Sequence, residues 1–441
     1  MSNQSSPSYR WYVVGILTLS YLVSFLDRQI LALMVGPIKA DLQLSDTEIS
    51  LIMGVAFSLF YAFMGIPLGW LADRTNRRNI IIVGITFWSL MTAACGLAST
   101  FIHLFLARIG VGAGEASLTP SAISIISDYF SRQDRGRAIA TYNMGVSLGT
   151  GIAMVLGGIV ISFVVDSPYI ELPLVGTLST WQYIFFVVSI PGLLVAIVIF
   201  FTISEPIRTE TLTTHETQFS IVFVFKYMQK NSDVYFPLYT ALSLSTLVGY
   251  AYFSWIPTVF VRIYGWGIPE IGYAFGLIVL IAGPSGVIIC GWLVDLLYKS
   301  GKYDASVRIA LAGSAITLPS AVGLPLAPNA EWALIIVGAA MFGGAMTSAA
   351  GVVAIVTVTP NQMRGQATAI YLFCISFLGL SIGATSVALI TDYIFYAEKM
   401  LSWSLSIVCS SSSVCSVLLF WASLRPFYSA TQNIEAKSYE Q

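Results

Sequence analysis

Twelve long apolar stretches are the feature that most constrains how this chain can fold. A helix needs about 20 largely apolar residues to cross a bilayer. The chain is 56% hydrophobic and only 10% charged, whereas a soluble domain has roughly 25% charged residues. The sequence therefore predicts an all-α membrane protein with twelve transmembrane helices. The stretches cover about residues 11–36, 47–71, 79–99, 102–128, 137–164, 181–203, 234–262, 270–297, 307–326, 332–358, 366–390 and 401–424.

The lysines and arginines indicate how these helices are oriented. If the N-terminus is placed inside the cell, only Lys39, Arg262 and Lys399 of the 21 basic residues fall on the outer side, and Arg28 and Arg108 lie within spans. An excess of basic residues marks the cytoplasmic side of a membrane protein. We therefore expect both termini in the cytoplasm, and we expect a monomer in the plasma (inner) membrane.

Two short patterns occur once in each half of the chain. GWLADRTNRRN at 69–79 matches GWLVDLLYKSG at 291–301, and RGRAIA at 135–140 matches RGQATA at 364–369. Repeats at such an offset predict one six-helix unit used twice, with a substrate site between the halves near the middle of the membrane. The predicted parts are a six-helix bundle over 1–203, a cytoplasmic linker over 204–232, a second six-helix bundle over 233–426 and a cytoplasmic tail over 427–441.

Four charged residues lie inside apolar spans of the first half. Asp27 and Arg28 are adjacent in the first span, and Arg108 and Glu115 share one helix face in the fourth. A charge at this depth costs on the order of 3 kcal/mol or more and usually marks a functional site. A buried carboxylate responds strongly to a nearby arginine, so an arginine that moves between Asp27 and Glu115 would change which acid holds a proton. The alternative is a pair of static buried salt bridges.

The stretch from 69 to 79 predicts a conformational latch on the cytoplasmic side. Gly69 lets a neighbouring helix approach, and Asp73 is followed by Arg74 and Arg77. We expect Asp73 to pair with Arg135 or with the start of the fifth span. Simple positive-inside topology is the alternative explanation. Three glycines of the fourth span allow another helix to pack closely; they are Gly110, Gly112 and Gly114.

The GWLADRTNRR stretch resembles the signature of the major facilitator superfamily, which lies between the second and third helices of that family. The twelve spans, the midpoint linker and the RGRA repeat agree with this resemblance. Phe25-Leu26-Asp27-Arg28, Arg108, GVGAGEAS at 110–117 and Asp128-Tyr129-Phe130 further resemble the spinster family of lipid transporters. The resemblance implies that Asp27 and Glu115 couple transport to protons. It implies that Arg28 and Arg108 pair with charges or bind a phosphorylated headgroup.

The seventh span, in the second half, is aromatic and polar instead of charged. Tyr250 and Trp255 of this span, with Tyr371 of the eleventh, are candidates for lining a substrate cavity. The alternative is that these rings form interface belts or pack the core. A cavity with charges on one wall and aromatic rings on the other would suit a substrate with an acidic head and an apolar body.

These observations predict a secondary active transporter that is proton-coupled, works by alternating access and moves an amphiphilic anionic lipid of the lysolipid or sphingoid type. The alternative is a proton symporter of a small organic anion, such as a sugar acid or an aromatic acid. A third hypothesis is a transporter-like sensor. The sequence has no nucleophile–base set and no metal-ligand spacing among its five cysteines and two histidines. We therefore expect no enzyme activity, cofactor, metal or nucleic-acid partner.

Overall fold

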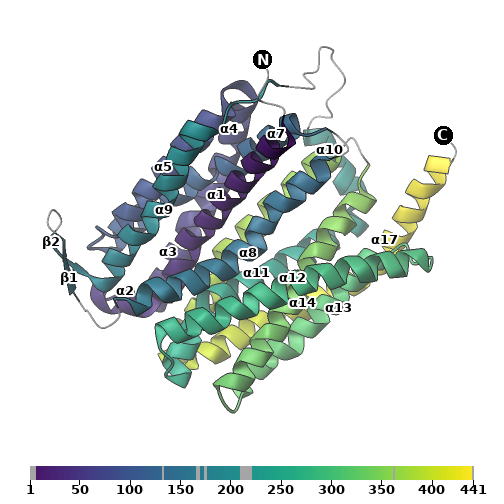
Figure 1. Ribbon diagram of the computed structural model, residues 1–441. Helices are drawn as coiled ribbons and strands as arrows, with labels where there is room; N and C mark the ends of the chain where they lie inside the picture. Colours follow the sequence, from purple (N-terminus) through teal and green to yellow (C-terminus); the bar gives the residue numbers. More distant parts are fainter. Residues whose placement is uncertain are drawn as a thin grey trace. The chain divides into compact units, whose positions relative to one another are not determined.

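The computed structural model describes residues 6–131, 134–164, 169–172, 176–208, 221–360 and 363–439. Most of these residues are helical (Figure 1). Twelve helical segments in this part of the chain are long and apolar enough to cross a membrane. Each coincides with one of the twelve predicted spans to within several residues, so the predicted fold class is confirmed.

Some spans are single helices and others are built from two or more pieces. The single helices are α1 (Pro7–Leu33), α5 (Arg77–Cys95), α8 (Arg135–Ser162), α9 (Thr180–Thr202), α11 (Ser232–Tyr264), α12 (Ile268–Lys299) and α14 (Ala330–Val358). The composite spans are α3 and α4 (Asp46–Met53, Val55–Arg74), α6 and α7 (Phe101–Glu115, Leu118–Tyr129), α13 and η1 (Ala305–Gly323, Leu324–Leu326), α15, η3, α16 and η4 (Arg364–Cys374, Ile375–Ile382, Gly383–Ile390, Thr391–Phe395), and η5 and α17 (Glu398–Met400, Leu401–Tyr439). Two shorter helices are α2 (Val35–Leu42) and α10 (Ile221–Lys230).

Short polar side chains mark where several of these helices begin. Ser45 and Glu48 form a reciprocal capping box at the start of α3. The side chain of Asn76 caps α5, and that of Thr100 caps α6, each by accepting a hydrogen bond from a backbone N–H of the first turn. Such caps satisfy N–H groups that have no partner within the helix. They therefore fix the residue at which each apolar span starts.

A β-hairpin between α8 and α9 was not predicted. Strands β1 (Tyr169–Leu172) and β2 (Gly176–Ser179) pair antiparallel, with Tyr169 opposite Ser179. This region was expected to be a connection between spans, because four-residue strands are too short to show a clear alternation of apolar and polar residues. The hairpin is an addition to the otherwise helical fold.

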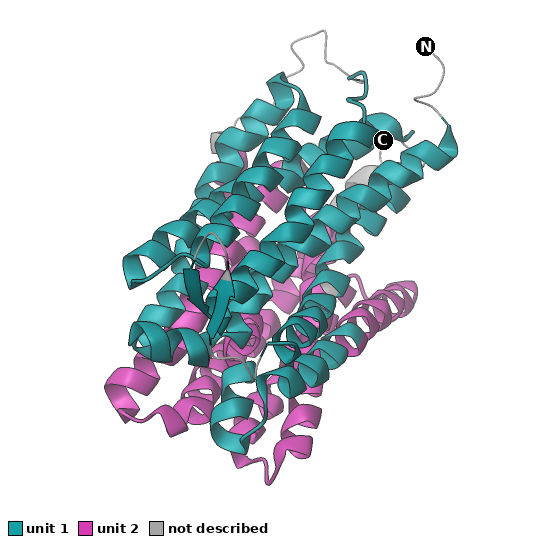
Figure 2. Cartoon of the chain, turned by 60° about the vertical axis from the view of Figure 1, so that its left-hand side comes forward, with its two compact units in different colours: residues 1–211, 256–280 teal, residues 212–255, 281–441 magenta. Residues whose placement is uncertain are grey.

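The chain divides into two compact units, shown in two colours in Figure 2. Unit 1 comprises residues 1–211 and 256–280, and unit 2 comprises residues 212–255 and 281–441. Residues 256–280 therefore group with the first half, in contrast to the predicted boundary. The division into two sequence halves stays a prediction. The predicted linker contains helix α10, and the predicted tail continues α17 as far as Tyr439.

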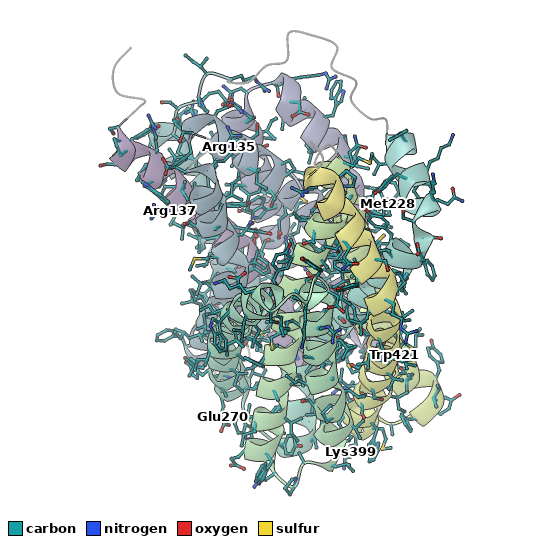
Figure 3. All side chains as sticks on the ribbon, turned by 90° about the vertical axis from the view of Figure 1, so that its right-hand side faces the viewer. Arg135, Arg137, Met228, Glu270, Lys399 and Trp421 are labelled. Carbon is teal, nitrogen blue, oxygen red and sulfur yellow. The ribbon has the colours of Figure 1, made fainter. Side chains whose placement is uncertain are left out.

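In unit 1, α1 lies beside α8, while α5 packs against both α6 and α9 (Figure 1). Figure 3 shows Arg135 and Arg137, at the start of α8, near one end of this unit and Glu270 of α12 at the opposite end. Asp46 at the start of α3 is fully buried. It accepts a 2.6 Å hydrogen bond from Lys39 and two, of 2.7 and 2.8 Å, from Arg262. These bonds tie residue 262 of α11 to α3.

In unit 2, α13 packs against α14 and α17. A cluster of hydroxyl groups lies among four of its helices. The Ser245 and Ser416 hydroxyls are 2.7 Å apart, and Ser416 donates to the Ala241 carbonyl at 2.9 Å. Ser314 contacts Ser416 and Thr347, each at 3.4 Å. Hydrogen bonds of this kind help to hold helices together where no water is present.

Candidate functional site

The four charged residues predicted from the sequence meet inside unit 1. Asp27 and Arg28 lie on α1, and Arg108 and Glu115 lie on α6. Asp27 and Arg108 are each 1% exposed, and Glu115 is 2% exposed. Because an isolated buried charge is very costly, the arrangement of hydrogen bonds among these four side chains determines what the site can do.

Glu115 is held by Arg28. The Arg28 Nε donates to Glu115 Oε2 at 2.7 Å, and Nη2 lies 2.5 Å from the same oxygen. The Arg28 side chain is 14% exposed, whereas that of Glu115 is 1% exposed. The other oxygen, Oε1, has no hydrogen-bond partner among the residues that the structure describes. Arg28 thus binds one carboxylate oxygen of Glu115 through charge-assisted hydrogen bonds. The other oxygen of Glu115 makes no hydrogen bond within the described residues.

Asp27 differs from Glu115. Neither of its carboxylate oxygens has a hydrogen-bond partner within the described part of the chain. Arg108 does not donate to this carboxylate; its Nη1 donates instead to the backbone carbonyl of Asp27 at 3.2 Å. The site therefore contains one acid bound to an arginine and one acid without such a bond. The predicted exchange of an arginine between the two acids stays a prediction.

Aromatic rings surround the Arg28 guanidinium. Its central carbon lies 4.9 Å from the centre of the Phe25 ring, 4.6 Å from that of Phe57 and 5.1 Å from that of Tyr61. The Arg108 guanidinium lies 5.4 Å from the Phe57 ring. Rings at this distance stabilise a cation by about 0.5–2 kcal/mol. Phe57 and Tyr61 were not predicted as site residues, because an aromatic residue in an apolar span carries no distinguishing signal.

Gly112 allows α6 to pack closely against α4. A methyl group at Gly112 would lie 3.1 Å from the carbonyl carbon and 3.2 Å from the Cα of Phe57, and it would overlap the Phe57 carbonyl oxygen. The backbone of α4 thus occupies the space that a side chain at residue 112 would need. This contact agrees with the close packing predicted for the glycines of this span.

Gly112→Ala is expected to lower the stability of the protein by about 1–3 kcal/mol, because α4 must move to make room for the methyl group. Thermal unfolding of the purified protein in detergent measures this effect. Gly15→Ala on α1 is the matched control, since nothing lies within 4 Å of a methyl group at residue 15. Equal melting temperatures for the two variants would contradict the packing described for Gly112.

Arg77, one of the predicted latch residues, is buried and joins three segments of unit 1. It pairs with Asp128 at the end of α7, and its Nε donates to Glu205 at 2.7 Å. It also donates to the Ser124 hydroxyl at 2.9 Å and to the Pro206 carbonyl at 3.2 Å. Arg77 therefore connects the start of α5 with α7 and with the segment that follows α9.

The predicted pair between Asp73 and Arg135 is not among the contacts of the described residues. Arg135 instead donates to the Ser127 carbonyl at 2.9 Å. The backbone carbonyl of Asp73 accepts a 2.5 Å hydrogen bond from Arg208, which also donates to two neighbouring carbonyls at the end of α4. Arg208 thus caps this helix end, a contact that was not predicted from the sequence.

The two other predicted latch residues, Arg74 and Gly69, make few side-chain contacts. The Arg74 guanidinium stacks on the Trp70 ring at 4.2 Å. A methyl group added at Gly69 would reach only Pro120, at 4.0 Å. Neither residue is therefore held as tightly as Arg77, and the latch as a whole stays a prediction.

Two of the three predicted cavity residues are core residues of unit 2. Trp255 is fully buried, and its indole N–H donates to the Ala384 carbonyl at 2.9 Å. Tyr371 is buried and packs edge-to-face against Tyr239, with ring centres 6.0 Å apart. Tyr250 is partly exposed. Trp255 and Tyr371 thus agree with the alternative expectation that these rings pack the core, because both residues are buried in this structure.

The described residues contain no group of three or more His, Cys, Asp or Glu side chains that is arranged to hold a metal ion. The candidate site is therefore the set of charged residues on α1 and α6, with the rings around Arg28.

The model of the Major Facilitator Superfamily matches residues 17–384. Two curated relatives have similar sequences. An MFS-type efflux pump of Mycolicibacterium smegmatis is 23% identical over 425 residues, which cover 95% of this chain and 94% of the relative. A probable L-galactonate transporter of Escherichia coli is 24% identical over 340 residues, which cover 74% and 71%.

The fold is also similar to that of a solved structure, a bacterial homologue of the human lysosomal transporter spinster in an inward-facing and unoccupied conformation. The two chains are 25% identical and superpose with a TM-score of 0.79, over 97% of this chain and 98% of the other. The likeness thus extends over nearly the whole length of both proteins.

Proposed function

The chain belongs to the Major Facilitator Superfamily as a spinster-like membrane transporter with twelve transmembrane helices, and we propose that it is driven by protons and moves an anionic amphiphilic lipid by alternating access. The cargo is of the lysolipid or sphingoid-phosphate type. The observation that carries this proposal is the unequal state of the two buried acids, one bound to Arg28 and the other without a hydrogen-bond partner among the described residues.

This inequality supports proton coupling. An ionised carboxylate is stabilised by a hydrogen-bonded arginine, whereas a buried carboxylate without one favours proton uptake. If Arg28 left Glu115 to bind an anionic substrate, Glu115 would become the acid without a partner. Substrate binding and protonation would then influence each other through ordinary electrostatics, and each would shift the balance between conformations.

The surroundings of Arg28 support an amphiphilic cargo. A guanidinium binds phosphate or carboxylate oxygens through two parallel hydrogen bonds. The rings of Phe25, Phe57 and Tyr61 lie around this guanidinium, so an apolar body attached to an anionic head would find apolar contacts beside its charge. The resemblance of the sequence motifs to the spinster family of lipid transporters favours the same class of cargo, and the solved spinster homologue has the same fold.

A small organic anion, such as a sugar acid or an aromatic acid, is the second candidate. It is favoured by the relative named as a probable L-galactonate transporter. A sugar acid carries several hydroxyl groups that need hydrogen-bond partners, whereas the rings around Arg28 supply few. This chemical difference makes the lipid the first choice.

Reconstituted liposomes with an internal pH dye test the proposal. Lysophospholipids, sphingoid phosphates and sugar acids are added in turn, and substrate-dependent proton movement is recorded. We expect the lipids to evoke proton flux and Asp27→Asn to reduce that flux at least about tenfold, because the amide cannot take up a proton and such a loss corresponds to about 1.4 kcal/mol. Asp233→Asn at the exposed start of α11 is the matched control.

Each outcome has a distinct meaning. Flux evoked only by small anions would leave the coupling residues in place and replace the lipid by the second candidate. Unchanged lipid-driven flux in Asp27→Asn would remove Asp27 from the coupling mechanism. Substrate binding without any proton flux would overturn proton coupling and favour an uncoupled carrier or a sensor.

A further inference from the structure

A groove on the surface of unit 1 has no part in the proposed function. It lies between α4 and α5 and has a volume of about 400 Å³. Val83 and Phe87 on its rim are 67% and 43% exposed, so the groove opens to the surroundings of the protein. The side chains that form its two walls are apolar: Met64, Leu68 and Leu71 of α4, and Ile80, Val83 and Phe87 of α5.

The base of the groove is the junction between α6 and α7. Gly114 and Ser117 lie at this junction and line the groove, and both are buried. A methyl group at Gly84 of α5 would overlap the Ser117 side chain and would lie 3.0 Å from the Gly114 carbonyl oxygen. Because Gly84 has no side chain, α5 packs directly on this junction and the groove reaches down to it. A molecule in the groove would therefore contact the chain on both sides of Glu115.

The groove is polar at one end. Thr75, Asn76 and Asn79 line that end, where α4 stops and α5 begins. From Asn79 the groove follows α5 as far as Phe87, about 12 Å at the rise of an α-helix. From Thr75 it follows α4 back to Met64, about 16 Å. The hydrocarbon core of a bilayer is about 30 Å thick, so the length of the groove corresponds to one leaflet.

The polar end of the groove is also positively charged. Arg74 and Arg78 adjoin its polar residues in the chain, and Arg208 donates to the Thr75 carbonyl at 2.7 Å. The Arg74 side chain is exposed and lies on the Trp70 ring. Four arginines and three acids are joined here by sequence or by contact, which leaves one positive charge. They are Arg74, Arg77, Arg78 and Arg208, with Asp73, Asp128 and Glu205.

The lining of the groove determines what can fill it. Apolar walls give water too few hydrogen-bond partners, and an empty groove would lose the dispersion contacts of its lining atoms. The two walls belong to membrane-spanning segments, which are surrounded by lipid hydrocarbon instead of water. An acyl chain would make apolar contacts along the whole groove, and its headgroup would then lie at the polar end.

We propose that this groove binds one acyl chain of an anionic phospholipid, with the phosphate of the headgroup at Arg74 and Arg78, beside Asn79. Guanidinium and amide N–H groups both donate hydrogen bonds to phosphate oxygens, and arginines at the membrane surface attract anionic lipids. The occupant is a resident lipid of the leaflet that the basic residues predict to be cytoplasmic. It is distinct from the transported cargo, so the inference goes beyond the proposed function and does not depend on it.

Val83→Trp tests the apolar part of the groove. Purified, delipidated protein is titrated with phosphatidylglycerol, and native mass spectrometry counts the bound lipids. The indole ring would occupy space that the acyl chain needs, so we expect the first phosphatidylglycerol to bind at least about tenfold more weakly. Ile66→Trp is the matched control, because Ile66 is an apolar residue of α4 that is 72% exposed and does not line the groove. If Val83→Trp does not fold, Leu68→Trp fills the same groove from α4.

Asn79→Asp tests the polar end. A negative charge beside the arginines would repel the phosphate, and we expect phosphatidylglycerol to bind about fivefold more weakly, the effect of about one charge at the membrane surface. The variant should fold, because an acid in the first turn of a helix is favourable. Asn79→Gln keeps a neutral amide and should bind like the wild type. Phosphatidylcholine, which has no net charge, should bind the wild type more weakly than phosphatidylglycerol does.

A phosphatidylglycerol with a photoreactive group midway along its acyl chain locates the site. We expect it to label the residues of α4 and α5 that line the groove. Labelling confined to other spans would overturn the site, and so would equal phosphatidylglycerol affinity in Val83→Trp and Ile66→Trp. Equal affinity of the wild type for the two lipids would overturn recognition of an anionic headgroup. These measurements involve no transport, so a failure of the proposed function would leave their outcome unchanged.

Discussion

Glu115→Gln is expected to lower proton-driven substrate uptake at least about tenfold, a loss of about 1.4 kcal/mol or more, while substrate binding or exchange stays partly intact. Glutamine neither takes up a proton nor balances the charge of Arg28. In the structure Arg28 contacts Glu115 Oε2 through both Nε and Nη2. Breaking one side of a buried ion pair is far more costly than losing an exposed one.

Counterflow of labelled substrate without a pH gradient separates coupling from binding in this variant. Glu331→Gln is the matched control, because Glu331 lies exposed in the first turn of α14. Full proton-driven uptake by Glu115→Gln would exclude Glu115 as a coupling residue. Loss of both uptake and exchange would instead assign Glu115 to substrate binding or to the integrity of unit 1.

Arg77→Ala is expected to destabilise the protein by about 3 kcal/mol, because it removes a buried guanidinium that binds two partly buried carboxylates. Arg77 is 1% exposed and binds both Asp128 and Glu205, whose side chains are 9% and 21% exposed. Both carboxylates would lose their hydrogen-bonded cation in the same variant. The melting temperature in detergent and the fraction of protein that stays monodisperse measure the effect.

Arg74→Ala provides the comparison for Arg77, since it removes a neighbouring arginine that is exposed and stacks on Trp70. We expect its melting temperature to change little, as is usual for an exposed charge. If the two variants melted alike, the network around Arg77 would not contribute to stability as its burial implies.

The fold was predictable because a membrane span leaves a strong signal, about 20 apolar residues in a row. The four charged residues were predictable for the same reason, since Asp27 and Glu115 stand out in apolar stretches. The pairing of each arginine with an acid could not be predicted. Arg28 and Glu115 are 87 residues apart in the chain, and such residues form a pair only through helix packing. Sequence spacing says nothing about that packing.

Residues that look ordinary in the sequence were beyond prediction for a different reason. Phe57 and Tyr61 are of kinds common in membrane helices, and only their position next to the Arg28 guanidinium distinguishes them. Trp255 and Tyr371, which were predicted to line a cavity, are buried in unit 2, and their part in a cavity stays a prediction. A large aromatic residue has the same appearance in a sequence whether it packs the core or meets a ligand.

The composition of the site has a consequence for the electrical work of transport. With both acids ionised, Asp27, Arg28, Arg108 and Glu115 sum to zero net charge. A proton on one acid raises the sum by one, and a monoanionic cargo returns it to zero. Moving one charge through a membrane potential of 100 mV takes about 2.3 kcal/mol. A site that binds one proton and one monoanion would thus carry the same net charge as the empty site. The membrane voltage would then neither drive nor oppose the conformational change that moves the loaded site through the membrane field.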